Sequence, residues 1–525
     1  MRIAITGATG NMGREVMKEI VALGGVESIR MLSRSEKRIK ELFKILKKHL
    51  KDTGGDLKAL DKIEVVCGSL ADSELCKKLV ADTDYVLAIG AVIPPQSDMN
   101  PKSAVACNEH GTNALVTAIE SERTQPKLIH ISTVAVYGNR NSRHPWGRVG
   151  DPLLLSPLDI YSATKMRGEF RVMNSSVEKW VVLRQSAMLH DNMLSGNLSD
   201  GLMFHTCFNA PLEWVTAHDS GVLIRRILER DVAGELNENN FWKKCFNIGG
   251  GAVNRLTGFD TLNDGFKMIG GTAKDYFKPY YNCTRNFHGV WFSDGEELDR
   301  LFGYVSQSAT DYWDHIARLH PVYALGKIVP KGIIASAAIK RLFKNYNSPA
   351  YWYKHDDEVR LKAYFGGREK YEALPKKWGD FPLLKENRDE WGGTLDFESL
   401  RTNKTSIDYG FDFDKDDSDI DIADLRSVAE AHGGELVTAT FTTGDMHALV
   451  KWRTQDGEEF EATPYSVLRG GHWYNISYRE NIWDFDRLAK KDRIFAQLWY
   501  DSHERDEDTL YGLDENFKAY MRESK

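Results

Sequence analysis

The stretch RIAITGATGNMG, residues 2–13, predicts the first strand, turn and helix of a parallel α/β sheet. Gly7 permits the tight turn, Gly10 lets the backbone approach a ligand, and Gly13 allows the helix to pack closely on the strand. The unpaired N–H groups at the start of that helix favour an anion. We therefore predict that a dinucleotide binds by its pyrophosphate along Gly7, Thr9, Gly10, Asn11, Met12 and Gly13.

The end of the second predicted strand bears on the choice of dinucleotide. In NAD sites an acidic residue about 20 positions after the glycines holds the ribose hydroxyls. This chain has Ser33 and Arg34 there, followed by Lys37 and Arg38. Cations attract a 2′-phosphate, so the pattern favours NADP over NAD. Alternatively, a solvated Arg34 stacks on adenine, which fits either cofactor.

Short apolar runs alternate with helix-length segments up to about residue 251, as in strands joined by crossover helices. This predicts an α/β fold: a Rossmann-type, doubly wound parallel sheet with a small substrate subdomain in residues 1–320. We expect a helical linker at 321–360 and a smaller α+β domain at 361–525. The predicted strands of the sheet are 2–6, 28–33, 63–67, 85–89, 127–132, 180–184 and 245–248.

The composition excludes several classes of protein. A net charge of -7 argues against binding of nucleic acid, which needs clustered cations. The six cysteines are scattered without C-x-x-C spacing, which indicates a reduced, cytoplasmic protein. No apolar run is long enough for stable membrane insertion.

The pattern YSATK at 161–165 places Tyr161 and Lys165 on the same face of a helix. A free tyrosine has a pKa near 10, and a neighbouring cation stabilises its phenolate. Lys165 could thereby prepare Tyr161 to exchange a proton with a substrate oxygen during hydride transfer.

Together these motifs make the chain resemble the extended short-chain dehydrogenase/reductase family, which contains nucleotide-sugar epimerases and 3β-hydroxysteroid dehydrogenases. The resemblance covers roughly residues 1–308. It is carried by TGATGNMG at 6–13, NEHGTN at 108–113, STVAVYG at 132–138, YSATK at 161–165, LR at 183–184 and FNIGG at 246–250.

The resemblance also implies roles for particular residues. Thr133 would hydrogen-bond the reacting oxygen, Tyr161 would be the acid–base, and Lys165 would also bind the nicotinamide ribose. The family suggests a homodimer through helices near Tyr161. Further cofactor contacts would come from Ser69 and Leu70 near adenine, Ile89, Gly90 and Ala91 after the fourth strand, Asn108, and Gln185 and Ser186 near the nicotinamide.

Three departures from the family narrow the reaction. Val134 and Ala135 replace the Asp-Glu pair of sugar-nucleotide dehydratases, and Ala187 replaces an asparagine that holds substrate phosphates in many epimerases. The arginine-rich diphosphate clamp is not evident, although Arg285 could be a remnant. We therefore expect oxidation or reduction of an alcohol or ketone on a largely apolar, steroid-like small molecule. A nucleotide-sugar epimerase and a cofactor-binding scaffold or sensor are the alternatives.

Five aromatic residues bear weakly on the substrate, and core packing explains most of them equally well. They are Tyr280, Tyr281, Phe287, Trp291 and Phe292. The charged segment 36–62 is predicted as an exposed helix and loop. Residues 327–347 are predicted as an apolar helix with basic flanks, either packed or, as a minority interpretation, a lid or membrane-surface contact.

Residues 424–477 resemble a treble-clef zinc-ribbon repeat. In this part of the chain we expect a helix at 421–431 and strands at 435–441 and 448–452. That repeat normally holds zinc with Cys and His. The matching positions here are Thr454, Glu458, Tyr474 and Ser477, which are neither thiolate nor imidazole, so we predict no metal and expect His472 to be packed or exposed rather than a ligand. The acidic stretch 412–421 lacks the glycine and glutamate of a calcium loop.

Overall fold

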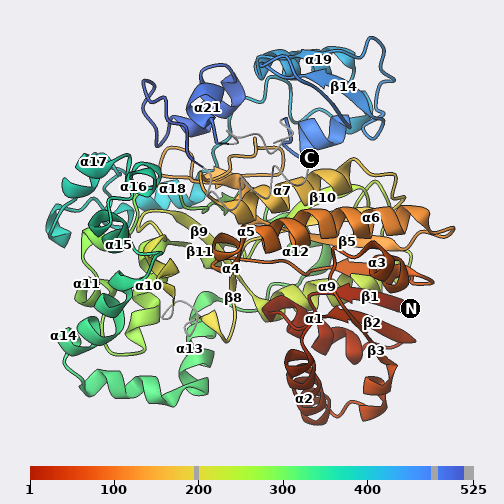
Figure 1. Cartoon of the computed structure of the whole chain (residues 1–525), viewed down its shortest axis with the longest axis horizontal. Helices are drawn as coiled ribbons and strands as arrows, with labels where there is room; N and C mark the ends of the chain where they lie inside the picture. Colours follow the sequence, from red (N-terminus) through yellow and green to blue (C-terminus); the bar gives the residue numbers. More distant parts are fainter. Residues whose placement is uncertain (194–199, 474–482, 513–525) are drawn as a thin grey trace.

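The computed structural model describes residues 1–193, 200–473 and 483–512 (Figure 1). Its centre is a sheet of seven parallel strands in the order β10-β7-β5-β4-β1-β2-β3, which confirms the predicted fold class. Each predicted strand is present, with its ends shifted by at most about one residue. The strands are β1 (Arg2–Thr6), β2 (Ser28–Ser33), β3 (Ile63–Cys67), β4 (Tyr85–Ala88), β5 (Lys127–Thr133), β7 (Trp180–Gln185) and β10 (Lys244–Ile248).

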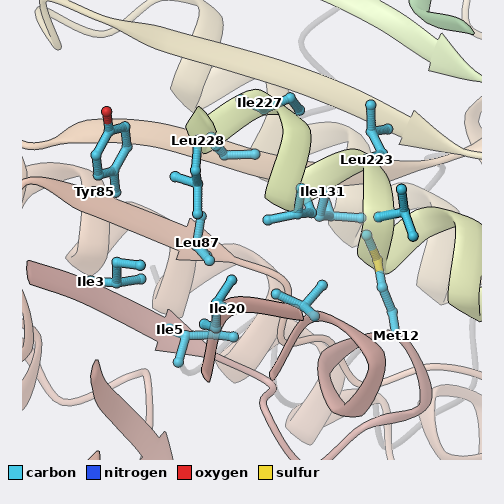
Figure 2. Close-up of a cluster of buried hydrophobic side chains, with 14 of the residues drawn as sticks. Ile3, Ile5, Met12, Ile20, Tyr85, Leu87, Ile131, Leu223, Ile227 and Leu228 are labelled. Atoms are coloured by element: carbon cyan, nitrogen blue, oxygen red, sulfur yellow. The ribbon is translucent and has the colours of Figure 1, made fainter. Parts of the chain in front are cut away.

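One face of the sheet is covered by α1 (Asn11–Val21), α2 (Glu36–Thr53), α9 (Ala217–Val232) and α12 (Glu296–Phe302). Figure 2 shows strand residues such as Ile5 and Leu87 meeting helix residues such as Ile20 and Leu223. The predicted exposed helix is α2, although Leu42, Leu46 and Leu50 lie at a spacing of four and are buried. The rest of that segment is the short 3-10 helix Leu57–Lys62.

The opposite face carries α3 (Ser73–Val80), α6 (Gly111–Ser121) and α7 (Ile160–Met173). Between β4 and α6 the chain makes the short turns α4 (Gln96–Met99) and α5 (Pro101–Ala104) and the π-helical turn η2 (Val105–His110). Because β4 and β2 lie on either side of β1, the strand order reverses there. Parallel α/β sheets bind their ligands in the crevice at this point.

The substrate subdomain adds a three-stranded sheet of β8 (Ala187–Leu189), β9 (Pro211–Thr216) and β11 (Arg255–Thr257), and a pair formed by β6 (Trp146–Gly147) and β12 (Trp291–Phe292). Leu361 and Phe365 pack against Cys207 and Cys283 of this subdomain. Residue 361, the expected start of the C-terminal domain, lies inside helix α16, which packs on the substrate subdomain. The subdomain's helices include α10 (Gly258–Lys267), α11 (Ala273–Tyr276), α13 (Ala309–Leu319), α15 (Pro349–Lys354), α16 (Glu358–Phe365) and α17 (Arg368–Glu372).

The single helix predicted at 327–347 is wrong in its bounds. The 3-10 helix η7 (Pro321–Ile328) comes first, and a second helical run follows as α14 (Lys331–Ile334), the π-helical η8 (Ala335–Ile339) and the 3-10 helix η9 (Lys340–Lys344). Pro330 separates the two runs, because proline has no N–H to continue a helix and pushes the residue before it out of helical geometry. None of the described helices is both long and apolar enough to cross a bilayer.

The C-terminal region contains α18 (Phe397–Thr402), α19 (Ile422–Ala431), α20 (Phe485–Ala489), α21 (Arg493–Trp499) and an antiparallel sheet of β13 (Glu435–Leu436), β14 (Val450–Arg453) and β15 (Glu459–Ala462). The helix at 421–431 is confirmed; the first strand is shorter than predicted, and β15 was not predicted. Thr454 and Glu458 lie at the turn between β14 and β15, whereas Tyr474 and Ser477 lie outside the described residues.

This region packs directly on the back of α7. His472 is buried, and its Nε2 lies 2.9 Å from Oε1 of Glu169, which also pairs with Arg184. Burial alone would raise the pKa of Glu169, but Arg184 and His472 hold it well below its usual range. Arg184 Nη2 also donates to the carbonyl of Gly470 at 2.6 Å. The C-terminal region therefore shares its core with the sheet domain.

Candidate active site

A cavity of about 1330 Å³ lies at the carboxyl ends of the parallel strands. It begins at the glycine turn after β1, passes the ends of β2, β4, β5 and β7, and ends against the substrate subdomain. All of the predicted cofactor and catalytic residues lie on its wall except Asn108. They are Gly7, Thr9, Gly10, Asn11, Met12, Gly13, Ser33, Arg34, Ser69, Leu70, Ile89, Gly90, Ala91, Thr133, Tyr161, Lys165, Gln185 and Ser186.

The glycine turn has the tight geometry that the sequence predicts. Gly7 has a φ of +73°, and a Cβ there would lie 2.6 Å from Cα of Gly90. A Cβ on Gly13 would lie 2.1 Å from the carbonyl oxygen of Gly7, which is too close for any side chain. The hydroxyl of Thr6 accepts from the N–H of Gly90 at 3.0 Å and so joins the ends of β1 and β4.

The start of α1 faces the cavity and is supported from the far side of the crevice. Gly10 is the N-cap of α1 and has no side chain to satisfy the free N–H groups that follow it. The Asn11 amide nitrogen lies 3.2 Å from Nε2 of His190, and the Asn192 amide donates to the Asn11 carbonyl oxygen at 3.1 Å. These contacts connect the glycine turn to the segment after β8.

At the end of the cavity beside β2 and β3 the wall is basic. Arg34 is exposed at the end of β2, and Arg14 and Arg38 line the same part of the wall, with Ser69 and Leu70 opposite. Lys37, which the sequence groups with these cations, does not lie on the wall. The position of Arg34 fits a contact with a 2′-phosphate or with adenine.

The reacting end contains Thr133, Tyr161 and Lys165. The hydroxyl of Thr133 accepts from the N–H of Ala135 at 3.2 Å. Burial raises the pKa of Tyr161 to about 12, against a hydrogen bond with Thr133 that lowers it. Burial also lowers the pKa of Lys165 to about 8, and its ammonium donates to the carbonyl of Ile131 at 2.6 Å.

These values correct the expectation that Lys165 lowers the pKa of Tyr161. The ammonium is directed to the end of β5, and burial dominates the titration of the phenol. Tyr161 is therefore protonated at neutral pH.

Asn108 is buried behind the wall rather than on it. Its carbonyl oxygen accepts from the N–H of Val92 at 2.7 Å, and its amide donates to the carbonyl of Val92 at 2.9 Å. The amide also donates to the hydroxyl of Thr164 at 3.1 Å. Asn108 thus fixes the loop after β4 against the helix that carries Tyr161, which is a positioning role instead of the predicted cofactor contact.

A polar cluster of Asp98, Asp159, His288 and Arg360 lines the substrate end and was not predicted. Asp159 is the N-cap of α7 and accepts from the N–H of Ser162 at 3.1 Å, and its carboxylate lies 3.7 Å from Nδ1 of His288. Burial and then the charge of Asp159 raise the pKa of Asp98 to about 7, while Ser97 and Arg360 oppose that shift. Arg360 also pairs with Asp357.

Apolar side chains also line the substrate end, namely Ala187, Met188, Leu202, Met203, Leu212, Trp214, Leu262 and Phe287. Of the five aromatic residues singled out above, Phe287 alone lines this cavity. Trp291 and Phe292 are buried in the core, and Tyr281 packs in a separate apolar cluster. Arg285 is not a diphosphate clamp, because it is buried and paired with Glu507.

The order of these features along the chain is that of the short-chain dehydrogenase/reductase fold. Residues 3–183 match the family model described as the NAD dependent epimerase/dehydratase family.

A curated relative, described as an uncharacterized membrane protein of Methanocaldococcus jannaschii, is 25% identical over 178 residues. That match covers 34% of this chain and 44% of the relative, so it spans less than half of the relative's length.

Solved structures with a similar fold include the following three chains. A UDP-glucose 4-epimerase of Bifidobacterium longum, in complex with NAD+ and UDP, is 14% identical with a TM-score of 0.46, and the match covers 62% of this chain and 100% of that one. A dTDP-glucose 4,6-dehydratase double mutant of Streptomyces venezuelae is 18% identical with a TM-score of 0.47, covering 61% and 97%. A short-chain dehydrogenase/reductase superfamily protein of Agrobacterium tumefaciens is 19% identical with a TM-score of 0.42, covering 62% and 99%.

Proposed function

We propose that the chain is an NAD(P)-dependent oxidoreductase that interconverts a ketone and an alcohol on a largely apolar substrate. One observation carries this proposal: Thr133 and Tyr161 lie in the same cavity as the glycine turn, next to an apolar wall. Hydride transfer needs a dinucleotide site and a proton donor around one substrate pocket.

The residues of the cavity fit a dinucleotide. Gly7 and Gly13 leave no room for side chains between the turn and its neighbours, so the N–H groups at the start of α1 can reach a pyrophosphate. Arg34 would contact the adenosine, and Gln185 and Ser186 would lie along the nicotinamide end. When bound, the cofactor supplies or accepts the hydride. We propose NADP rather than NAD because a cation, Arg34, and not a carboxylate, directly follows β2.

At neutral pH Tyr161 is in the protonated form that the reduction of a ketone requires. Because the pKa of Tyr161 is about 12, its phenol carries the proton that the carbonyl oxygen of the substrate takes up. The hydroxyl of Thr133 would hydrogen-bond that same oxygen. Lys165, held by the carbonyl of Ile131, would orient the ribose and the phenol.

The substrate end fits a molecule with an apolar body and at least one polar group. The apolar wall of Met203, Trp214 and Phe287 would contact the body, and the cluster around Asp159 and His288 would meet a hydroxyl or a charge. The same polar cluster favours the second candidate, a nucleotide-sugar epimerase, whose substrate is polar throughout.

A turnover screen with NADP and NAD separates these functions. We expect NADPH to be oxidised when steroid ketones are added and not when UDP-sugars are added. Turnover of a UDP-sugar alone would replace the apolar substrate with a sugar nucleotide. If neither class turned over while the dinucleotide still bound, the scaffold or sensor alternative would stand. A homodimer and a cytoplasmic location remain part of the proposal, and light scattering of the purified chain tests the former.

A further inference from the structure

A stripe of exposed apolar side chains runs along the 3-10 helix η7 and the residues beside it. In a 3-10 helix, side chains three positions apart lie directly above one another. Val322, Leu325 and Ile328 follow that spacing and are 61%, 58% and 81% exposed. Leu319, the last residue of α13 before His320, is 47% exposed. Ile333, beyond the break at Pro330, is also 58% exposed. We call this set of five residues the apolar stripe.

The other side of η7 is anchored to the subdomain. A Cβ on Gly326 would lie 2.8 Å from Cβ of Ile269, so the helix backbone rests directly on that residue. Tyr323 packs beside Trp313 and Ile316 of α13, and Ile334 turns inward to the cluster around Phe277. One side of η7 therefore packs on the subdomain, and the side chains of the stripe point away from it toward solvent.

The surroundings of the stripe are basic. From His315 to His355 the chain contains no aspartate or glutamate, and it contains seven lysines and arginines, although the net charge of the whole chain is -7. Arg318, Lys327 and Lys331 lie next to the stripe in sequence and are exposed. Two acids offset part of this charge: Asp275 lies 2.9 Å from Lys331, and Asp311 of α13 interacts with Arg318. An apolar strip bordered by cations matches a surface that is apolar inside and anionic outside.

The stripe lies close in the chain to the substrate end of the cavity. The helical run that follows Pro330 ends at Lys344, and the next residues, Tyr346 and Asn347, line the cavity. In Figure 1, α13 and α14 flank this segment at the lower left, on the opposite side of the molecule from α19.

We propose that the apolar stripe docks the chain on the surface of a bilayer with anionic headgroups. A second copy fits less well, because a symmetric contact would place the cations around one stripe against those around the other. The stripe is one face of short helical turns, so the docking is peripheral and needs no spanning helix. Delivery of a lipophilic substrate from that bilayer to the cavity rests on the proposed function, whereas the docking itself does not.

Flotation of the full chain with vesicles tests the docking without dinucleotide or substrate. We expect it to bind vesicles of equal parts phosphatidylcholine and phosphatidylserine, and to bind phosphatidylcholine alone more weakly. The double variant Leu325→Ser/Ile328→Ser should bind the mixed vesicles on the order of a hundredfold more weakly, because two apolar side chains no longer enter the bilayer. Lys327→Glu should weaken binding by about fivefold, and salt should have the same direction of effect.

The matched controls change equally exposed positions elsewhere. Val232 and Val253 are 61% and 67% exposed, and Val232→Ser/Val253→Ser should bind as the parent does. Lys48→Glu on α2 makes the same control for charge. All variants should retain the circular dichroism of the parent, since the changed side chains point outward.

Three results would overturn the docking. These are a parent chain that does not float with the mixed vesicles, a Leu325→Ser/Ile328→Ser variant that floats as well as the parent, and self-association that this variant abolishes while vesicles have no effect. Turnover of a water-miscible ketone without lipid tests the proposed function separately. If the chain binds vesicles but turns over no ketone, the docking proposal holds and the delivery of substrate to the cavity does not.

Discussion

The two ends of the cavity are built in different ways. At the nucleotide end each part of the wall directly follows a strand of the sheet: Gly7 to Gly13 after β1, Ser33 and Arg34 after β2, and Ile89 to Ala91 after β4. At the substrate end Asp98, Asp159, His288 and Arg360 come from four segments far apart in the chain. Backbone geometry therefore defines the first site, and tertiary packing assembles the second.

Tyr161→Phe tests whether the two ends meet at this residue. The change removes the proton donor and leaves the packing, so turnover should fall by about 10²–10⁴. Dinucleotide affinity, measured by fluorescence titration, should hardly change. Tyr353→Phe, on the exposed face of α15, is the matched control. Turnover that survives in Tyr161→Phe would move the proton donor to the polar cluster.

Gly7→Ala should break the nucleotide end. Gly7 has a φ of +73° and would place its Cβ against Gly90, whereas Gly25 has a φ of +77° and nothing within 4 Å of the added Cβ. Both alanine variants carry the backbone strain, and Gly7→Ala should lose a further 1–3 kcal/mol, on the order expected for overpacking. Urea unfolding measures the difference. If both variants lost the same free energy of unfolding, the ends of β1 and β4 would have room for the added Cβ.

Arg34→Asp should shift cofactor preference at that end. A carboxylate there repels a 2′-phosphate and accepts from ribose hydroxyls, so the ratio of the Kd values for NADP and NAD should change by about tenfold or more toward NAD. Lys37→Asp, off the cavity wall, should leave the ratio unchanged. An unaltered ratio in both variants would remove Arg34 from cofactor selection.

Asp98→Asn should have the smallest effect, at the substrate end. Because the pKa of Asp98 is about 7 in the folded chain and near 4 when unfolded, the folded state holds this proton more tightly. The contribution of Asp98 to stability therefore falls as pH rises from about 4 to about 7. The asparagine variant should gain about 1 kcal/mol relative to the parent at pH 8, since water screens part of the half-buried charge, and nothing at pH 4. Thermal unfolding at both pH values measures this, and equal differences would mean that Asp98 is not perturbed.

The nucleotide end could be predicted because its determinants are local. Seven strands, the glycine turn and the Tyr161 helix each depend on residues a few positions apart, and the structure brings them together. The role of Asn108 was misassigned because its partners Val92 and Thr164 are contacts that only the folded chain reveals. The direction of the Tyr161 pKa was missed for the same reason, since burial is not visible in a spacing of four residues.

The substrate end left few signals in the sequence. Asp159 could have been found, because an aspartate three positions before Ser162 at the start of a helix is an N-cap pattern. Asp98 and Arg360 lie in segments without a motif, and they reach the cavity through short turns and a helix of the distant 349–372 region. The break in the helix at Pro330 could have been predicted from the sequence, since proline at that position cannot continue a helix.

The contact between Glu169 and His472 has a consequence for how the chain is made. The two residues are separated by 303 positions, so a ribosome finishes α7 long before it makes the histidine that pairs with Glu169. Until then the carboxylate of Glu169 has Arg184 as a partner but not His472, and the face of α7 that residues 465–472 cover lacks that cover. The packing of α7 is thus completed only after the C-terminal region has been made, so the folding of this helix depends on a segment that is synthesised late.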